Sequence, residues 1–261
     1  MEVIIQKDPD AAANLVARLI ASDLRAKPDL VLGLATGSTM ERVYRRLVQM
    51  HHSEKLDFSR CRTFNLDEYV GLAPADPNSY RYYMDQHLFK QVNVKPENTH
   101  LPIGNAADLD AECRHYEKLI QEAGGIDLQL LGIGKSGHIG FNEPLSALRS
   151  RTRVKALTPT TLQQNAQYFG GEDKMPRRAI TMGVGTILES RRCLLLATGV
   201  SKAEVLAKAV EGPITSMISA SSLQWHPRCT VVVDDAAACR LREHEYYRWI
   251  FANEPEWQEF Q

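Results

Sequence analysis

Six short apolar runs, separated by segments of helical periodicity, constrain the fold of this chain more than any other feature of its sequence. They comprise residues 30–34, 62–65, 128–133, 179–182, 193–197 and 230–233. Their apolar residues are nearly continuous rather than alternating with polar ones, which is typical of strands buried on both faces of a parallel sheet. The sequence therefore predicts a three-layer α/β/α fold with a mostly parallel sheet.

Apolar residues spaced by three or four positions predict helices between these runs. The stripes contain Leu15, Leu19 and Ile20; Val43, Leu47 and Met50; Tyr116, Leu119 and Ile120; and Val205, Leu206, Ala209 and Val210. Gly124-Gly125 and Gly212-Pro213 follow the last two stripes as stop signals. Because no internal repeat or linker-like stretch interrupts this order, we expect residues 1–261 to form a single domain.

Charge and cysteine usage exclude several classes of protein. Lys plus Arg total 31 against 32 Asp plus Glu, and no basic run stands out, which argues against a nucleic-acid partner. No apolar stretch reaches the roughly 18 residues that cross a membrane, and the opening residues are not typical of a signal peptide. The five scattered cysteines contain no CxxC pair, which argues against a disulfide framework and a metal cluster. We expect a cytoplasmic protein with no metal and no membrane partner.

In open α/β sheets, ligands bind where loops leave the carboxyl ends of the strands. Four such loops carry unusual polar residues, at positions 35–40, 66–80, 132–144 and 198–202. The first offers small and hydroxyl residues before a helix, which is typical of a phosphate cradle; they are Thr36, Gly37, Ser38 and Thr39. A tight turn in which Thr39 caps the helix is the alternative. Lys202 in the first turn of a helix also favours an anionic ligand, because a lone cation there opposes the helix dipole.

The other two loops carry groups for acid–base chemistry. Asp67 and Glu68 follow a buried strand, which favours a raised pKa in one of them, although solvated or capping carboxylates are the alternative. The third loop contains matches to two nucleotide-binding motifs, GxGxxG and the end of a Walker motif. Both matches are misleading. Pro144 leaves little room for the helix, residues 152–161 offer no acid for a ribose hydroxyl, and Gln129 stands where the Walker motif needs a glycine. What remains is an acid–base pair formed by His138 and Glu143.

These loops resemble those of the glucosamine-6-phosphate deaminase (isomerase) family over nearly the whole chain. The matching stretches are LGLATGST, FNLDEYVGL, NSY, LGIGKSGHIGFNEP, SRTRVK, GVGTIL, TGVSKAEVLAKAVEG and SLQWHP. FNLDEYVGL and GHIGFNEP are specific to this family, whereas the hexose-phosphate lactonases that share the fold differ after the glycine-histidine turn. The resemblance implies a modified Rossmann-like fold, no cofactor and a hydrolase that converts glucosamine 6-phosphate and water into fructose 6-phosphate and ammonia.

Carried over residue by residue, the resemblance implies that Asp67 moves the C2 proton to C1. It further implies that His138 opens the sugar ring with help from Glu143. The residues expected to hold the phosphate are Thr36, Gly37, Ser38, Thr39 and Lys202. Those expected at a regulatory site for N-acetylglucosamine 6-phosphate are Ser146, Arg153 and Lys155, with Ala156 in place of a threonine. A basic surface strand is the alternative interpretation of that segment. The family's regulated members imply a homo-oligomer, with a hexamer as one form.

Two residues depart from the family pattern near the reacting groups. Ser136 replaces the usual aspartate two residues before His138, so we expect weaker support of an imidazolium there. Gln167 replaces an arginine that assists phosphate binding, a loss of about 1.5–3 kcal/mol. These departures keep two alternatives open. One is a deaminase for galactosamine 6-phosphate, and the other is a sugar-phosphate sensor without catalysis.

Overall fold

The computed structural model describes residues 1–261 and contains a seven-stranded sheet and a three-stranded sheet. All strand pairs of the larger sheet are parallel, in the order β1-β10-β9-β6-β2-β3-β5. Its strands are β1 (Glu2–Gln6), β2 (Val31–Leu34), β3 (Arg62–Asn65), β5 (Thr99–His100), β6 (Leu128–Leu131), β9 (Arg192–Ala197) and β10 (Cys229–Asp234). The prediction of a mostly parallel sheet is confirmed.

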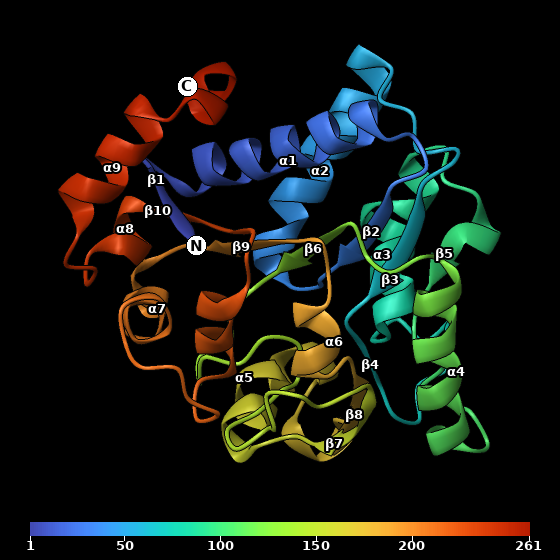
Figure 1. Cartoon of the computed structure of the whole chain (residues 1–261). Coiled ribbons are helices and arrows are strands. Elements are labelled where there is room, and N and C mark those ends of the chain that lie inside the picture. Colours follow the sequence, from blue (N-terminus) through green and yellow to red (C-terminus); the bar gives the residue numbers. More distant parts are fainter.

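Helices cover both faces of the large sheet and complete a three-layer α/β/α, Rossmann-like architecture. They are α1 (Pro9–Ala26), α2 (Ser38–Glu54), α3 (Tyr80–His87), α4 (Leu109–Glu122), α5 (Pro159–Phe169), α6 (Val184–Leu188), α7 (Ala203–Val210), α8 (Asp235–Ala238) and α9 (His244–Asn253). Helices α1 and α2 lie on one face, and α4, α6 and α7 lie on the other (Figure 1). None of these helices is long and apolar enough to span a membrane.

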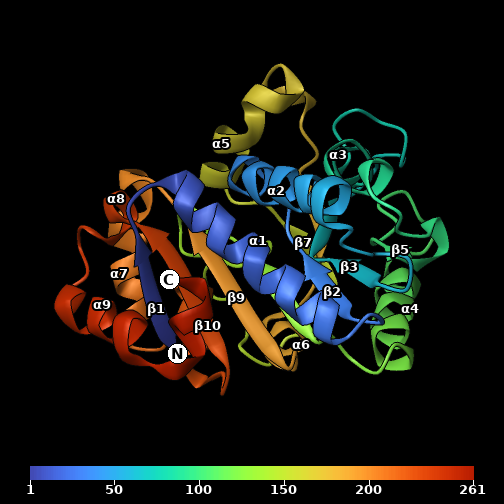
Figure 2. The ribbon, with the colours of Figure 1, turned by 90° about the horizontal axis from the view of Figure 1, so that it is seen from above.

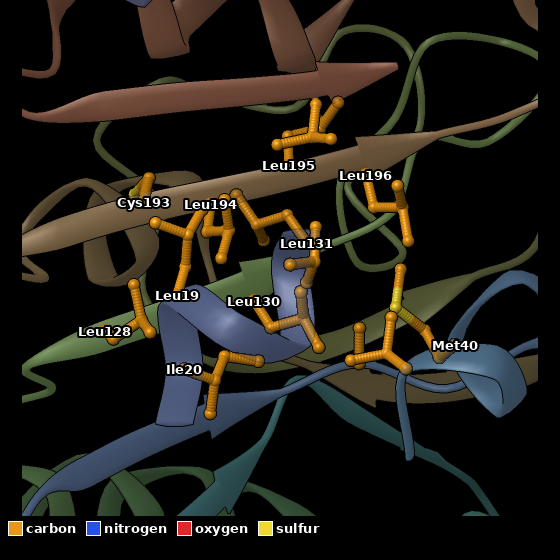
Figure 3. Close-up of a cluster of buried hydrophobic side chains, with 14 of the residues drawn as sticks. Leu19, Ile20, Met40, Leu128, Leu130, Leu131, Cys193, Leu194, Leu195 and Leu196 are labelled. Carbon is orange, nitrogen blue, oxygen red and sulfur yellow. The ribbon is translucent and has the colours of Figure 1, made fainter. Parts of the chain in front are cut away.

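The main core lies between α1, α2 and the central strands. Leu19 and Ile20 of α1 and Met40 of α2 pack against leucines of β6 and β9 (Figure 3). Leu19, Ile20 and Met40 are each at most 2% exposed, and burial of such a side chain contributes about 1.5–3 kcal/mol. The predicted stripes on α1 and α2 therefore face the sheet, which fixes how each helix is rotated about its axis.

The strand predicted at residues 179–182 is real, but its predicted place in the parallel sheet is wrong. It corresponds to β8 (Arg178–Thr181), which pairs antiparallel with β4 (Asp67–Tyr69) and β7 (Arg153–Ala156) in the smaller sheet. A separate apolar cluster that includes Tyr69 and Phe141 packs against this sheet. Its burial explains why the run has the apolar composition of a central strand.

Because the strands of the large sheet are parallel, the loops after β2, β3, β6 and β9 all leave the sheet at the carboxyl ends of its strands. We call this side of the molecule the polar edge. The four polar loops predicted to form a site are therefore neighbours in space. Helix α5 projects from the body beside α2 (Figure 2). It follows β7, so the smaller sheet carries a projecting helix next to the polar edge.

Candidate active site

His138, Ser136 and Glu143 form a compact hydrogen-bonded group in the long connection after β6. His138 Nδ1 lies 3.0 Å from Glu143 Oε2 and 2.7 Å from Ser136 Oγ. The Ser136 hydroxyl in turn donates to Glu143 Oε2 at 3.3 Å. This arrangement occupies Nδ1 and leaves Nε2 without a hydrogen-bond partner within the protein, so the ring is oriented to exchange a proton through Nε2.

Two glycines of the same connection explain why the loop packs so closely around the imidazole. A side-chain carbon at Gly134 would lie 2.1 Å from His138 Nε2, so no other residue fits there without displacing the ring. Gly137 has φ +81° and faces Val205 of α7 and Ile218 at a distance that no side chain tolerates. The glycines that mimic a dinucleotide motif thus hold the histidine in place.

Glu143 is almost fully buried and is held on its far side by the beginning of α5. Its Oε1 accepts hydrogen bonds from the hydroxyls of Thr158, at 3.1 Å, and Thr161. Burial raises the pKa of Glu143, but the hydrogen bonds from His138 and Thr161 and the charge of His138 outweigh it and bring the pKa to about 2. The carboxylate therefore stays ionised at neutral pH and presents a negative charge to the imidazole.

Asp67 lies on β4, at the edge of the site, and is only 6% exposed. Burial, followed by the nearby charge of Glu68, raises the pKa of Asp67 to about 8. A side-chain carbon at Gly140 would lie 3.6 Å from Asp67 Oδ2, so this carboxylate borders the connection that contains His138. A carboxyl group with such a pKa exchanges a proton readily near neutral pH.

Glu68 has a different place from its neighbour. Its carboxylate accepts hydrogen bonds from the backbone amides of Tyr69, Tyr80 and Arg81, and it thereby caps the N-terminus of α3. The capping alternative in the sequence is thus correct for Glu68 but not for Asp67, which accepts no hydrogen bond from the protein.

The loop from β2 to α2 presents free backbone amides at the start of a long helix. Gly37, with φ +113°, is the N-cap residue, and no side chain caps the helix. The alternative in which Thr39 caps α2 is therefore wrong. The amides of the first turn and the positive end of the helix dipole face the polar edge, as an anion site requires.

Lys202 joins the loop after β9 to the loop after β6. It lies at the end of a short 3-10 turn (Val200–Lys202) and is the N-cap residue of α7 rather than part of its first turn. Lys202 Nζ donates to the Ile133 carbonyl at 2.7 Å. Its amine is thereby held beside the connection that contains Ser136 and His138.

The residues expected at a regulatory site lie next to the acid–base group, on β7 and in the turn before it. Arg153 donates to the side chain of Asn142, at 2.9 Å, and burial lowers the pKa of Arg153. Ser146 is buried, and its hydroxyl has no partner within the protein. Lys155 is half-buried and makes no side-chain bond. Gln167 is exposed on α5, where its amide bonds to Gln164 of the same helix at 3.4 Å.

The sequence pattern does not indicate several residues that shape the site. Thr158 is the N-cap residue of α5, a signal visible in the threonine and proline that begin the helix, but its contact with Glu143 has no local signature. Tyr69 OH accepts from Tyr80 OH at 3.2 Å and from Asn165 at 3.1 Å, which links β4, α3 and α5. No group of three or more histidine, cysteine, aspartate or glutamate side chains has the arrangement of a metal site.

Comparisons with known proteins identify the family of this chain. A family model described as glucosamine-6-phosphate isomerases/6-phosphogluconolactonase matches residues 7–231. A protein of Hahella chejuensis named glucosamine-6-phosphate deaminase is 50% identical over 96% of this chain and 95% of its own. One of Giardia intestinalis, named glucosamine-6-phosphate deaminase 2, is 51% identical over 93% and 92%.

Solved structures place the same relationship in three dimensions. A structure described as a monomeric glucosamine-6-phosphate deaminase superposes with a TM-score of 0.91 at 48% identity, over 92% of this chain and 100% of the other. A 6-phosphogluconolactonase from Trypanosoma cruzi shares the fold, with a TM-score of 0.73 at 22% identity over 92% and 96%.

The relatives also correct one expectation. The class predicted from the sequence, a hydrolase, is wrong, because the relatives are named as deaminases and the family as isomerases.

Proposed function

The chain belongs to the glucosamine-6-phosphate deaminase (isomerase) family, and from that membership we propose that it converts glucosamine 6-phosphate and water into fructose 6-phosphate and ammonia. One observation carries the proposal beyond the likeness. A buried carboxyl group with a pKa of about 8, Asp67, borders the loop that holds a histidine between a serine and an ionised glutamate. An aldose-to-ketose conversion needs these two functions side by side.

The first step is the opening of the pyranose ring, and His138 carries it out. A proton leaves the O1 hydroxyl as another reaches the ring oxygen, the bond between C1 and the ring oxygen breaks, and C1 becomes an aldehyde. Glu143 bonds to Nδ1 of His138 and stabilises the positive charge on the imidazole while Nε2 transfers the proton. Ser136 supports the same nitrogen with a hydroxyl instead of a second charge.

Asp67 then performs the isomerisation. Its carboxylate removes the proton from C2, whose acidity the C1 aldehyde raises. The aldehyde oxygen takes up a proton from the solvent, and an enol amine forms between C1 and C2. The same group returns that proton to C1, so C1 gains the electrons that C2 loses and C2 becomes an imine. Water adds to C2 and ammonia leaves, which yields the ketone of fructose 6-phosphate without any external oxidant or reductant.

The phosphate group anchors the substrate far from the reacting carbons. The residues that hold it are Thr36, Gly37, Ser38 and Thr39 of the β2–α2 loop together with Lys202. Free amides, hydroxyls and one ammonium group suit a dianion at the start of α2. Fixing this end orients C1 and C2 towards Asp67 and lowers the entropy cost of the reaction.

Ammonia release from glucosamine 6-phosphate and from galactosamine 6-phosphate, measured side by side, tests the substrate. We expect turnover of the glucosamine epimer, as the names of the relatives indicate. Preferential turnover of the galactosamine epimer would move the proposal to that substrate. Binding of either sugar phosphate without release of ammonia would identify a sensor and contradict the proposed enzyme.

The proposal extends to the organisation of the whole protein. We treat residues 1–261 as one domain and place it in the cytoplasm, supported by five cysteines that are all unpaired.

A homo-oligomer is supported by the exposed side chains of Trp225 and Trp249, which are 67% and 58% exposed, whereas one solved relative is described as monomeric. We also propose that Ser146, Arg153 and Lys155 bind N-acetylglucosamine 6-phosphate in such an oligomer. Sedimentation velocity with and without N-acetylglucosamine 6-phosphate distinguishes these assemblies.

A further inference from the structure

Lys135 lies beside the proposed phosphate site and takes part in none of the contacts described so far. It is exposed in the loop after β6, one position before Ser136. Two positions earlier, the carbonyl of Ile133 accepts the hydrogen bond from Lys202 Nζ. Strands β6 and β9 are hydrogen-bonded neighbours, so the loops that carry Lys135 and Lys202 leave the sheet side by side.

Neither Lys135 nor Lys202 is paired with a carboxylate. Lys135 forms no ion pair, and Lys202 is bonded only to a neutral carbonyl. Burial, and then the charge of Lys135, lower the pKa of Lys202. The nearby carboxylates already have partners. Asp234 accepts hydrogen bonds from the backbone amides of Gly199 and Ala237, and Glu204 forms an ion pair with Lys208. Two adjacent like charges without a counterion cost free energy unless an anion binds there.

The same loop touches the start of α2. A side-chain carbon at Gly132 would lie 3.3 Å from Met40 Cε, in the first turn of that helix. The uncapped amides of α2, the amine of Lys202 and the loop of Lys135 therefore surround one region of the polar edge. An anion bound at the N-terminus of α2 lies within the field of both lysines.

Resting on the proposed function, we propose that Lys135 is a second phosphate-binding cation, which acts with Lys202 and the α2 amides to select a phosphorylated sugar. A phosphate dianion neutralises both lysines, and a singly charged or neutral ligand does not. Lys135 contacts only the phosphate end of the substrate, so it contributes equally to the ground state and to the transition state.

Kinetics of Lys135→Gln, which removes the charge and keeps a polar side chain that is one atom shorter, test this assignment. We expect KM for glucosamine 6-phosphate to rise about tenfold with kcat within about twofold. Lys135→Arg should restore most of the affinity. Lys95→Gln is the matched control. Lys95 is also exposed and unpaired, but it precedes the amino end of β5, whereas the proposed site lies at the carboxyl ends of the strands.

Binding measured by calorimetry separates the role of Lys135 from the proposed reaction. The two probes are inorganic phosphate and fructose 6-phosphate, the latter in the absence of ammonium, since neither is then turned over. Both dissociation constants should rise by the same factor in Lys135→Gln. If the wild type releases no ammonia but this pattern holds, the enzyme proposal fails and Lys135 keeps its role. A Lys135→Gln protein with the affinities of Lys95→Gln, or with a reduced kcat at unchanged affinity, would overturn the assignment.

Discussion

Thr161, in the first turn of α5, donates a hydrogen bond to the same carboxylate of Glu143 that faces His138. The projecting helix and the acid–base pair are therefore joined through one buried side chain. Thr158, the N-cap residue of α5, adds a second bond to the same oxygen. A displacement of α5 changes the hydrogen bonds of Glu143, and so the position of α5 and the contact between Glu143 and His138 are coupled.

Thr161→Val removes one of these bonds and keeps the shape of the side chain. Thr158 still donates to Glu143 Oε1 in this variant. The loss of one hydrogen bond to a charged group costs about 1.5–3 kcal/mol, so we expect a fall in kcat/KM and in thermal stability. Steady-state kinetics and thermal unfolding measure both effects. Thr160→Val, one position earlier on the exposed side of α5, should change neither value. Equal effects of the two substitutions would contradict the coupling.

Ser136→Ala should lower kcat about threefold to tenfold and leave KM unchanged, since the hydroxyl contacts His138 and Glu143 but not the substrate. Glu143 still orients Nδ1 in this variant, which is why activity persists. Ser53→Ala, at an exposed position near the end of α2, serves as control. A rise in KM without a fall in kcat would show that Ser136 binds the substrate instead.

The pH dependence of kcat/KM should follow the ionisation of Asp67. A base must be deprotonated to act, and burial has raised the pKa of Asp67 to about 8. We therefore expect kcat/KM to rise about tenfold per pH unit below pH 8 and to level off above it. A profile that is flat from pH 6 to 9 would show that another group accepts the proton.

Asp67→Asn should make the fold more stable at alkaline pH. Between the usual pKa near 3.8 and about 8, native Asp67 holds a proton that the unfolded chain has lost, so the free energy of unfolding falls as pH rises. The asparagine variant does not have this loss. Its stability relative to the wild type should increase from pH 5 to pH 8 by more than about 1 kcal/mol, as urea unfolding measures. No pH-dependent difference would mean that Asp67 ionises normally.

Gln167→Arg should lower KM for the sugar phosphate by at least about threefold. Helix α5, which carries residue 167, lies beside α2, whose uncapped N-terminus belongs to the proposed phosphate site (Figure 2). An arginine at position 167 therefore lies near the phosphate. Gln121→Arg on α4 introduces the same charge far from the site, and an equal effect of both would indicate a general effect of charge.

Local patterns predicted most of the large sheet because buried parallel strands have a distinctive composition. They missed β1, a five-residue edge strand whose apolar core is only three residues long. They also placed β8 in the wrong sheet, since the apolar run of 179–182 does not reveal its partner. Within the site, the pairing of His138 with Glu143 was predictable from five residues of sequence. The support from Thr158 and Thr161 was not, because it joins segments that only the fold brings together.

Deuterium placed at C2 of glucosamine 6-phosphate tests directly whether Asp67 moves the C2 proton to C1. We expect the wild type to release ammonia more slowly from this substrate and to transfer part of the deuterium to C1 of the product. Asp67→Asn should release no ammonia and leave the deuterium at C2, while remaining folded and able to bind fructose 6-phosphate. Retained transfer of deuterium in this variant would contradict the assignment of Asp67 as the base.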